Sequence, residues 1–402
     1  MKQHSSSSVV KKVRALFPGK GSRARTQGTQ HFDIIIAGGG IIGAAVGYGL
    51  ARKGCRVAIL DAPPIIDRAS RSNMGLIWSQ SKALGCPEYS RLGFLSSRLF
   101  PALGRELLDT SGIDIVYSPS GGIIPCLGEE DFNQRSNYID GLMAQSGGDY
   151  PGIMISRGQL EKMLPKINFG GQVVGGCFCE GDGFVEPLKL LFALRRGMVN
   201  LGGSFLNDSR VSSISRDAKG YVLKTAKKVF SCERLVLAGG MGNRQLAAHF
   251  DLKVPVQPTR GQVLLTERVG DLLPIPLLGI TRTPGGTVMV GFMHENVGMD
   301  TGLVPESLAK EANWAVSVWP GIADLRVIRC WSSLRVMPLD GYPVYDTIPG
   351  HSNAFLINTH SAVTLAAAHA KTLPDFVLGK GLPPDQQIFG LSRFKNIEVK
   401  KA

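Results

Sequence analysis

The sequence contains no apolar run long enough to cross a bilayer, although 44% of its 402 residues are hydrophobic, enough for a sizeable core. Histidine is scarce, with seven residues and none in the H-E-x-x-H spacing of a zinc enzyme. Cysteine also occurs seven times, an odd count with scattered spacings and no C-x-x-C pair. We therefore expect neither a disulfide framework nor a metal site, and we predict a reduced, cytoplasmic protein with buried thiols.

Acidic side chains are missing from residues 1–30, which hold seven of the basic residues behind the net charge of +13. The Ser, Gly and basic composition of this tail predicts disorder, and the tail lacks the apolar segment of a secretory signal. An organelle transit peptide would share that composition. Loose, peripheral contact with an anionic membrane surface is the alternative to a solvated extension. No basic motif interleaved with aromatic residues follows, so we expect no nucleic-acid binding.

A strand–helix–strand unit over residues 31–61 organises the rest of the chain. The apolar, β-branched run at 34–37 predicts a buried parallel strand. Residues 42–53 carry small and apolar side chains at helical spacing, and residues 56–60 predict a second strand. This order of elements is typical of a dinucleotide-binding α/β domain.

Three glycines, Gly38, Gly40 and Gly43, separate the first strand from the helix in the pattern G-x-G-x-x-G. The first permits a tight turn, the second a close approach of the pyrophosphate, and the third close packing of the helix on the sheet. The N–H groups and the positive end of the helix favour phosphate there. Asp61 ends the second strand, where an acidic side chain suits a ribose hydroxyl. A glycine turn without a ligand is the alternative.

A polar run with two arginines and several hydroxyls follows at residues 68–75. It suits the far side of a dinucleotide, with a polar surface loop as the alternative. Beyond residue 85 the strand–helix alternation stops, which indicates a second domain. Helices are predicted at 88–111, 129–147 and 156–164, and a strand pair within 113–127.

The character of the first domain returns with a helix at 188–201 and a buried strand, 234–240, that ends in two glycines. Other strands are predicted at 209–215, 220–225, 254–267, 280–282, 287–292, 326–338 and 354–358, and other helices at 305–318 and 362–373.

The first unit, the strand ending at Gly240 and the final strand–His–Ser–helix unit together resemble the D-amino-acid-oxidase family of flavoproteins. The resemblance covers most of the chain, and stretches 70–78, 258–262 and 334–341 are its most specific parts. These stretches look closest to the β subunits of opine oxidase, hydrogen cyanide synthase and D-hydroxyproline dehydrogenase.

The resemblance implies an α/β fold in which a Rossmann-like FAD-binding domain carries an inserted antiparallel-sheet α+β substrate domain. The expected FAD-binding domain comprises residues 31–84, 154–249 and 331–402, and the expected substrate-binding domain comprises 85–153 and 250–330. The FAD is expected to be noncovalent, because Cys330 is not at the position where related flavoproteins tether it.

The resemblance also implies a set of cofactor contacts. They are Gly38, Gly40, Ile41, Ile42, Gly43, Asp61, Ala62, Ser70, Arg71, Ser72, Asn73, Met74, Gly75, Val211, Gly239, Gly240, Arg335, Thr359, His360, Ser361, Ala362, Val363 and Thr364.

Two of these residues, Arg335 and His360, are the expected catalytic residues. A planar guanidinium at Arg335 would hold a substrate carboxylate with paired hydrogen bonds and orient the α-carbon, with a core ion pair as the alternative. His360 precedes a helix whose N-terminus the family aims at the flavin, with a purely structural histidine as the alternative. Thr359 and Ala362 replace the glycines usual at this point.

The resulting hypothesis is FAD-dependent oxidation of a C–N bond beside a carboxylate, in a D-amino acid, hydroxyproline, N-substituted glycine or opine. As a dehydrogenase subunit, the chain would pass electrons to a partner subunit with flavin or iron–sulfur centres. A self-sufficient oxidase that uses oxygen is one alternative, and a noncatalytic flavin-bound assembly protein is another.

Overall fold

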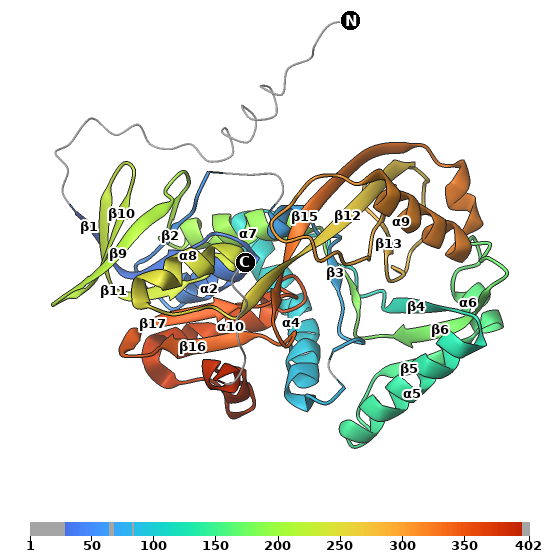
Figure 1. Cartoon of the computed structure of the whole chain (residues 1–402), viewed down its shortest axis with the longest axis horizontal. Helices are drawn as coiled ribbons and strands as arrows, with labels where there is room; N and C mark the ends of the chain where they lie inside the picture. The colour runs from blue at the N-terminus through green and yellow to red at the C-terminus, as the bar shows by residue number, and fades with distance from the viewer. Residues whose placement is uncertain (1–28, 64–67, 83, 396–402) are drawn as a thin grey trace, which may run out of the picture.

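The structure, a computed structural model, describes residues 29–63, 68–82 and 84–395 (Figure 1). The predicted disordered tail therefore lies outside the described residues, except for its last two positions. Figure 1 shows one sheet with its helices on the left and a second, antiparallel body on the right. No helix in the described part of the chain is both long and apolar enough to cross a membrane. The cytoplasmic location stays a prediction.

The larger sheet has the order β16-β17-β11-β1-β2-β8, with β10 and β9 added to the edge of β11. Neighbours from β17 to β8 are parallel, whereas β16, β10 and β9 pair antiparallel. The strands are β1 (Gln30–Ala37), β2 (Val57–Leu60), β8 (Ser204–Leu206), β9 (Val211–Asp217), β10 (Gly220–Thr225), β11 (Val229–Leu237), β16 (Val344–Ile348) and β17 (His351–Asn358). The predicted parallel Rossmann-like core is confirmed.

Four helices share the apolar core on one face of this sheet: α2 (Ile41–Arg52), α4 (Pro87–Ser111), α7 (Pro187–Asn200) and α10 (Ala366–Asp375). Helices α2 and α7 contact its strands, and α4 packs on α7 and α10. Helix α2 is buried along almost its whole length, because the sheet lies on one side and α7 and α10 lie on the other. The opposite face of the sheet is covered by β9, β10 and the short helix α8 (Asn243–Ala247). Both faces of the central strands are therefore apolar, as expected for parallel strands.

The second body contains the antiparallel sheet β13-β14-β12-β15 and the three-stranded sheet β4-β6-β5. An isolated bridge between Ile123 and Leu277 joins them. The elements are β4 (Gly122–Leu127), α5 (Glu129–Gln145), β5 (Gly152–Ser156), α6 (Arg157–Met163), β6 (Val173–Cys179), β12 (Val256–Arg268), β13 (Ile280–Arg282), β14 (Thr287–Val290), α9 (Pro305–Val318) and β15 (Val327–Pro338).

The long strands β12 and β15 run from the antiparallel body toward the larger sheet (Figure 1). The short helix α3 (Ala69–Ser72) packs on β15, and Trp331 Nε1 donates a hydrogen bond to the carbonyl oxygen of Ser72 over 3.0 Å. The pair β3 (Leu76–Ile77) and β7 (Gly183–Phe184) lies beside this junction. Polar segments from the first body therefore meet the strands of the second.

Two predicted elements differ from the observed ones. Only β4 forms within 113–127, because Val116 takes a left-handed φ of 51° and its N–H is held by the Asp114 carboxylate at 2.8 Å. The predicted helix 362–373 begins only at Ala366. The N–H of Ala362 turns back to the carbonyl of His360 at 2.6 Å, so the regular helical ladder starts later.

The predicted domain boundaries stay a prediction, but strand pairing favours moving one of them. Strand β6 pairs with β4 on one side and with β5 on the other, and among the described residues neither β5 nor β6 pairs with the larger sheet, although the expected FAD-binding domain includes residues 154–179. Their strand pattern is local, whereas the choice of partner strand is a long-range property that the pattern does not encode.

Candidate active site

A cavity of about 1100 Å³ begins at the turn after β1 and extends to residues of the antiparallel sheet. Every residue of the predicted cofactor set lines it except Gly43. Gly43 faces the turn instead, and a Cβ there would lie 2.0 Å from the carbonyl oxygen of Gly38. This contact fits the predicted role of Gly43 in close packing of the helix on the strand.

The turn between β1 and α2 leaves room for a ligand at its surface. Gly38 has a φ of +114°, which L-residues rarely adopt, and a Cβ at Gly40 would lie 2.9 Å from Ser70 Oγ. The first N–H of helix α2, on Ile41, donates to the same hydroxyl over 3.0 Å. The polar run at 68–75 thus lies directly over the helix N-terminus and lines the cavity, while its contact with a dinucleotide stays a prediction.

Asp61, the predicted ribose ligand, is already engaged by two arginines. Arg68 Nη1 donates to both carboxylate oxygens over 3.0 Å, and Arg195 Nη2 to one of them over 3.3 Å. Arg195 also donates to the carbonyl oxygen of Gly39. Burial lowers the pKa of Arg195 to about 10, while Asp61 opposes the shift. Asp61 therefore neutralises a buried cation as well as lining the cavity.

At the other end of the cavity, the Arg335 side chain lies along strand β12. Arg335 is paired with Thr259 in the β12–β15 register. A Cβ at Gly261 would lie 2.9 Å from two guanidinium nitrogens, so the bare glycine makes room for the side chain. Among the residues that the structure describes, the guanidinium has one long hydrogen bond, 3.5 Å from Nη2 to the carbonyl oxygen of Met293.

No carboxylate forms a salt bridge with Arg335 within residues 29–63, 68–82 and 84–395. The predicted alternative of a core ion pair would have to rest on the buried Glu311, which lies outside salt-bridge distance of Arg335. Burial lowers the pKa of Arg335, and the nearby Glu311 opposes this shift. Glu311 itself accepts hydrogen bonds from the N–H groups of Phe292 and Met293 and so holds that wall of the cavity in place.

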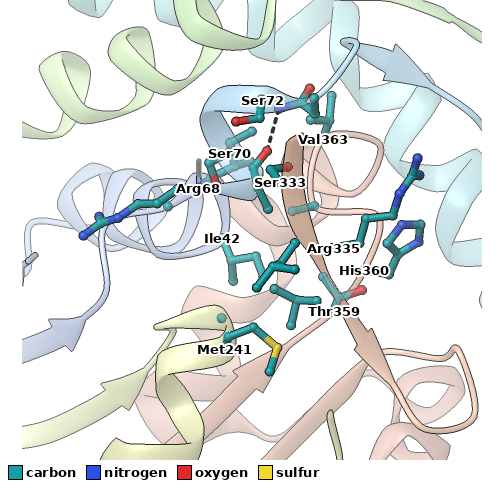
Figure 2. A pocket seen from close by; sticks show the side chains of 18 of the residues that line it. Ile42, Arg68, Ser70, Ser72, Met241, Ser333, Arg335, Thr359, His360 and Val363 are labelled. Atoms are coloured by element: carbon teal, nitrogen blue, oxygen red, sulfur yellow. Dashed lines mark hydrogen bonds between the residues drawn. The ribbon is translucent and has the colours of Figure 1, made fainter. Parts of the chain in front are cut away.

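His360 lies beside Arg335, far from Arg68 (Figure 2). Its pKa falls to about 3, mainly because of burial and also because of the charges of Lys82, Arg335 and His294. The His294 ring is 6.4 Å away between centroids, and desolvation and Arg335 lower its pKa to about 4. Both imidazoles are therefore neutral near pH 7 and are weak proton acceptors.

Residues 359–364 form the loop and turn before α10, so the helix N-terminus stands about one turn further from the cavity than predicted. Neither Thr359 nor Ala362 is strained. Among the described non-glycine residues, positive φ values occur only at positions 116, 208 and 251. The side chains that replace the usual glycines are thus compatible with the backbone.

Two orphaned polar atoms test whether a flavin fits this end. Trp78 Nε1 and Thr359 Oγ1 are buried and line the cavity, yet neither finds a hydrogen-bond partner within the described part of the chain. Buried polar groups are normally paired, so these two match a ligand with polar edges. Together with the glycine turn at the other end, they fit an extended flavin dinucleotide.

Several cavity residues escaped sequence reasoning because they come from segments far apart in the chain. They include Lys82, Tyr89, Arg195, Met241, Phe292 and His294. A local signal existed for Arg195, which sits among the buried Leu190, Leu191 and Leu194 on the apolar face of α7. A charged residue on such a face needs a partner, which Asp61 provides.

The glycine turn, the N-terminus of α2 at the cavity and the length of the cavity define a protein that binds a dinucleotide cofactor. The family model described as FAD dependent oxidoreductase (DAO) matches residues 33–375. The chain belongs to this family, and it is an FAD-dependent oxidoreductase.

Individual relatives agree with this assignment. The chain is 33% identical to a subunit of opine oxidase from Agrobacterium tumefaciens (strain Ach5), over 90% of this chain and 97% of that protein. It is 26% identical to the HcnC subunit of hydrogen cyanide synthase from Pseudomonas protegens, over 92% of this chain and 98% of that protein. The crystal structure of glycine oxidase from Geobacillus kaustophilus superposes with a TM-score of 0.83 at 26% identity, covering 91% of this chain and 99% of that one.

Proposed function

We propose that this enzyme oxidises the C–N bond of an amino acid or a secondary amine acid, such as a D-amino acid, hydroxyproline, an N-substituted glycine or an opine. One observation carries the proposal: a single cavity joins the dinucleotide turn at Gly38 to a guanidinium, Arg335, that lacks a carboxylate partner among the described residues. A buried cation of this kind suits an anionic substrate group.

Arg335 would bind the substrate carboxylate and thereby orient the α-carbon and its nitrogen. Bound FAD, held noncovalently by the residues of the glycine turn and the loop 359–364, would supply the acceptor for the hydride that leaves the α-carbon. The nitrogen must carry a free lone pair, because that pair forms the C=N bond as the hydride departs. Burial beside the positive charge of Arg335 disfavours an ammonium ion, so the cavity favours the neutral amine.

We also propose that the chain works as a dehydrogenase subunit. The opine oxidase and hydrogen cyanide synthase relatives are each named as one subunit of an enzyme, which supports a multisubunit assembly here. A partner subunit with flavin or iron–sulfur centres would then take the electrons. A self-sufficient oxidase is the second candidate, supported by the similarity to the glycine oxidase structure.

The test is an anaerobic absorbance titration of the FAD-loaded chain with D-proline, hydroxy-D-proline, sarcosine, glycine and an opine. At least one of them should bleach the flavin spectrum, and admitting air should then separate an oxidase from a dehydrogenase. Arg335→Met should lower the second-order bleaching rate by about 100-fold, as expected when a charge-assisted pair of hydrogen bonds is lost. Arg335→Lys should recover part of that loss.

The matched control is Arg329→Met, which removes an exposed arginine from the same strand, β15. It should leave the bleaching rate unchanged. A flavin that none of these compounds reduces, or full activity in Arg335→Met, would contradict the proposal.

A further inference from the structure

Lys82 is a second buried cation at the substrate end of the cavity. Its residue is 9% exposed, and it lines the same cavity as Arg335 and His360. The aliphatic part of the side chain packs on helix α4, where a Cβ at Gly93 would lie 3.3 Å from Lys82 Cγ. The ammonium group donates to Ser361 Oγ over 2.5 Å and lies 5.5 Å from the centre of the Tyr89 ring.

No acidic side chain neutralises this ammonium in the part of the chain that the structure describes, since none lies within salt-bridge distance of Lys82. Burial raises the pKa of the Asp182 carboxyl, and the positive charge of Lys82 lowers it slightly against this larger shift. Both Asp182 carboxylate oxygens are already occupied, because they accept hydrogen bonds from Ser79 and Gln80. An unpaired buried charge is costly, so its retention calls for an anionic ligand.

Lys82 and Arg335 lie at the same end of the cavity. The positive charges of both lower the pKa of the His360 imidazole, and Lys82 donates a hydrogen bond to the hydroxyl of the next residue, Ser361. If Arg335 holds one carboxylate of the substrate, Lys82 remains available at the same end of the cavity to bind a second anionic group. Arg68 and Arg195, by contrast, share an acidic partner, the Asp61 carboxylate.

We propose that Lys82 binds a second carboxylate of the substrate, so that the substrate is a secondary amine with a carboxylate on each of its two nitrogen substituents. This inference rests on the proposed function and narrows it to N-(carboxyalkyl) amino acids.

The test uses two unreactive ethers that mimic the two substrate classes. Diglycolate carries two carboxylates around a central oxygen, and methoxyacetate replaces one of them by hydrogen. Each is titrated into the FAD-loaded full-length protein, and binding is followed by the change in the flavin spectrum. Diglycolate should bind about 10- to 100-fold more tightly, the gain expected for one hydrogen bond to a charged group.

Lys82→Met should abolish this advantage while leaving methoxyacetate binding within about twofold, and Lys82→Arg should retain part of it. Arg335→Met should weaken both ligands. The control Lys189→Met removes an exposed positive charge from helix α7 and should change neither affinity. In turnover, Lys82→Met should lower kcat/KM for N-(carboxymethyl)alanine by a larger factor than for N-methylalanine.

Equal binding of the two ethers by the wild-type protein would overturn the assignment of Lys82. So would a Lys82→Met variant that weakens both ethers equally, or that alters the flavin spectrum without any ligand, since Lys82 would then act on the flavin. In those cases an amine acid still bleaches the flavin, and the proposed function stands. If neither ether binds and no amine acid bleaches it, the proposed function fails as well.

Discussion

Gly43→Ala should disrupt the dinucleotide turn although Gly43 does not line the cavity. The added Cβ would lie 2.0 Å from the Gly38 carbonyl oxygen and 3.3 Å from Ile36 Cγ2, whereas real Cβ contacts essentially never fall below 3.0 Å. Helix α2 or the turn must therefore move by about 1 Å, and overpacking of this kind costs about 1–3 kcal/mol. The shift displaces the backbone that would hold the pyrophosphate, so bound FAD should fall together with stability.

The assay is the free energy of unfolding in urea, measured with the ratio of flavin to protein absorbance in the purified protein. Gly158→Ala is the matched control. Gly158 lies in helix α6 with nothing within 4 Å of its added Cβ, so the substitution should stabilise the protein by about 0.5–1 kcal/mol. A Gly43→Ala protein with unchanged stability and full FAD content would refute the packing argument.

Two other substitutions test buried charges. Asp61→Asn should destabilise the FAD-free protein by about 3–5 kcal/mol in urea, because it leaves the buried Arg195 cation without its partner; a loss of FAD affinity alone would assign Asp61 to the ribose only. His369 is fully buried beside the Tyr345 hydroxyl, and burial lowers its pKa to about 3. Below about pH 6.5 the unfolded chain therefore takes up a proton at His369 and the folded chain does not. The free energy of unfolding thus decreases as the pH is lowered. Between pH 6 and 4, His369→Gln should reduce the slope of the free energy of unfolding against pH by about 1.4 kcal/mol per pH unit. Equal slopes for the wild-type protein and the variant would contradict this prediction.

The first domain was predictable because its signals are local. The apolar run, the three glycines and the helical spacing place α2 and β2 within one residue of their observed bounds. The bounds of α9 and β15 are also predicted within one residue. Both have a strong hydrophobic periodicity, and a proline marks the start of α9 at Pro305 and the end of β15 at Pro338. All but one of the predicted cofactor residues reach the cavity for a related reason: most of them follow strand ends, which parallel pairing brings to one edge.

Other features depend on contacts that no local pattern encodes. Helix α10 starts late because the Ala362 N–H bonds back to His360 and Thr364 Oγ1 accepts the N–H of Trp78, 286 residues away in the sequence. Lys82 follows a polar stretch that reads as an ordinary loop. Its role in the cavity depends on α4 and on the loop before α10 arriving beside it.

The two ends of the cavity differ in how their positive charges are balanced, and this difference has a functional consequence. At the nucleotide end, Arg68 and Arg195 share the single Asp61 carboxylate, so net positive charge remains beside the helix N-terminus, where phosphate would bind. At the other end, Arg335 and Lys82 have no such partner among the described residues. A neutral or cationic molecule would leave both charges desolvated and unpaired, whereas an anion would pair with them. Charge balance at the end where Arg335 and His360 lie therefore favours an anionic ligand, in line with the proposed function.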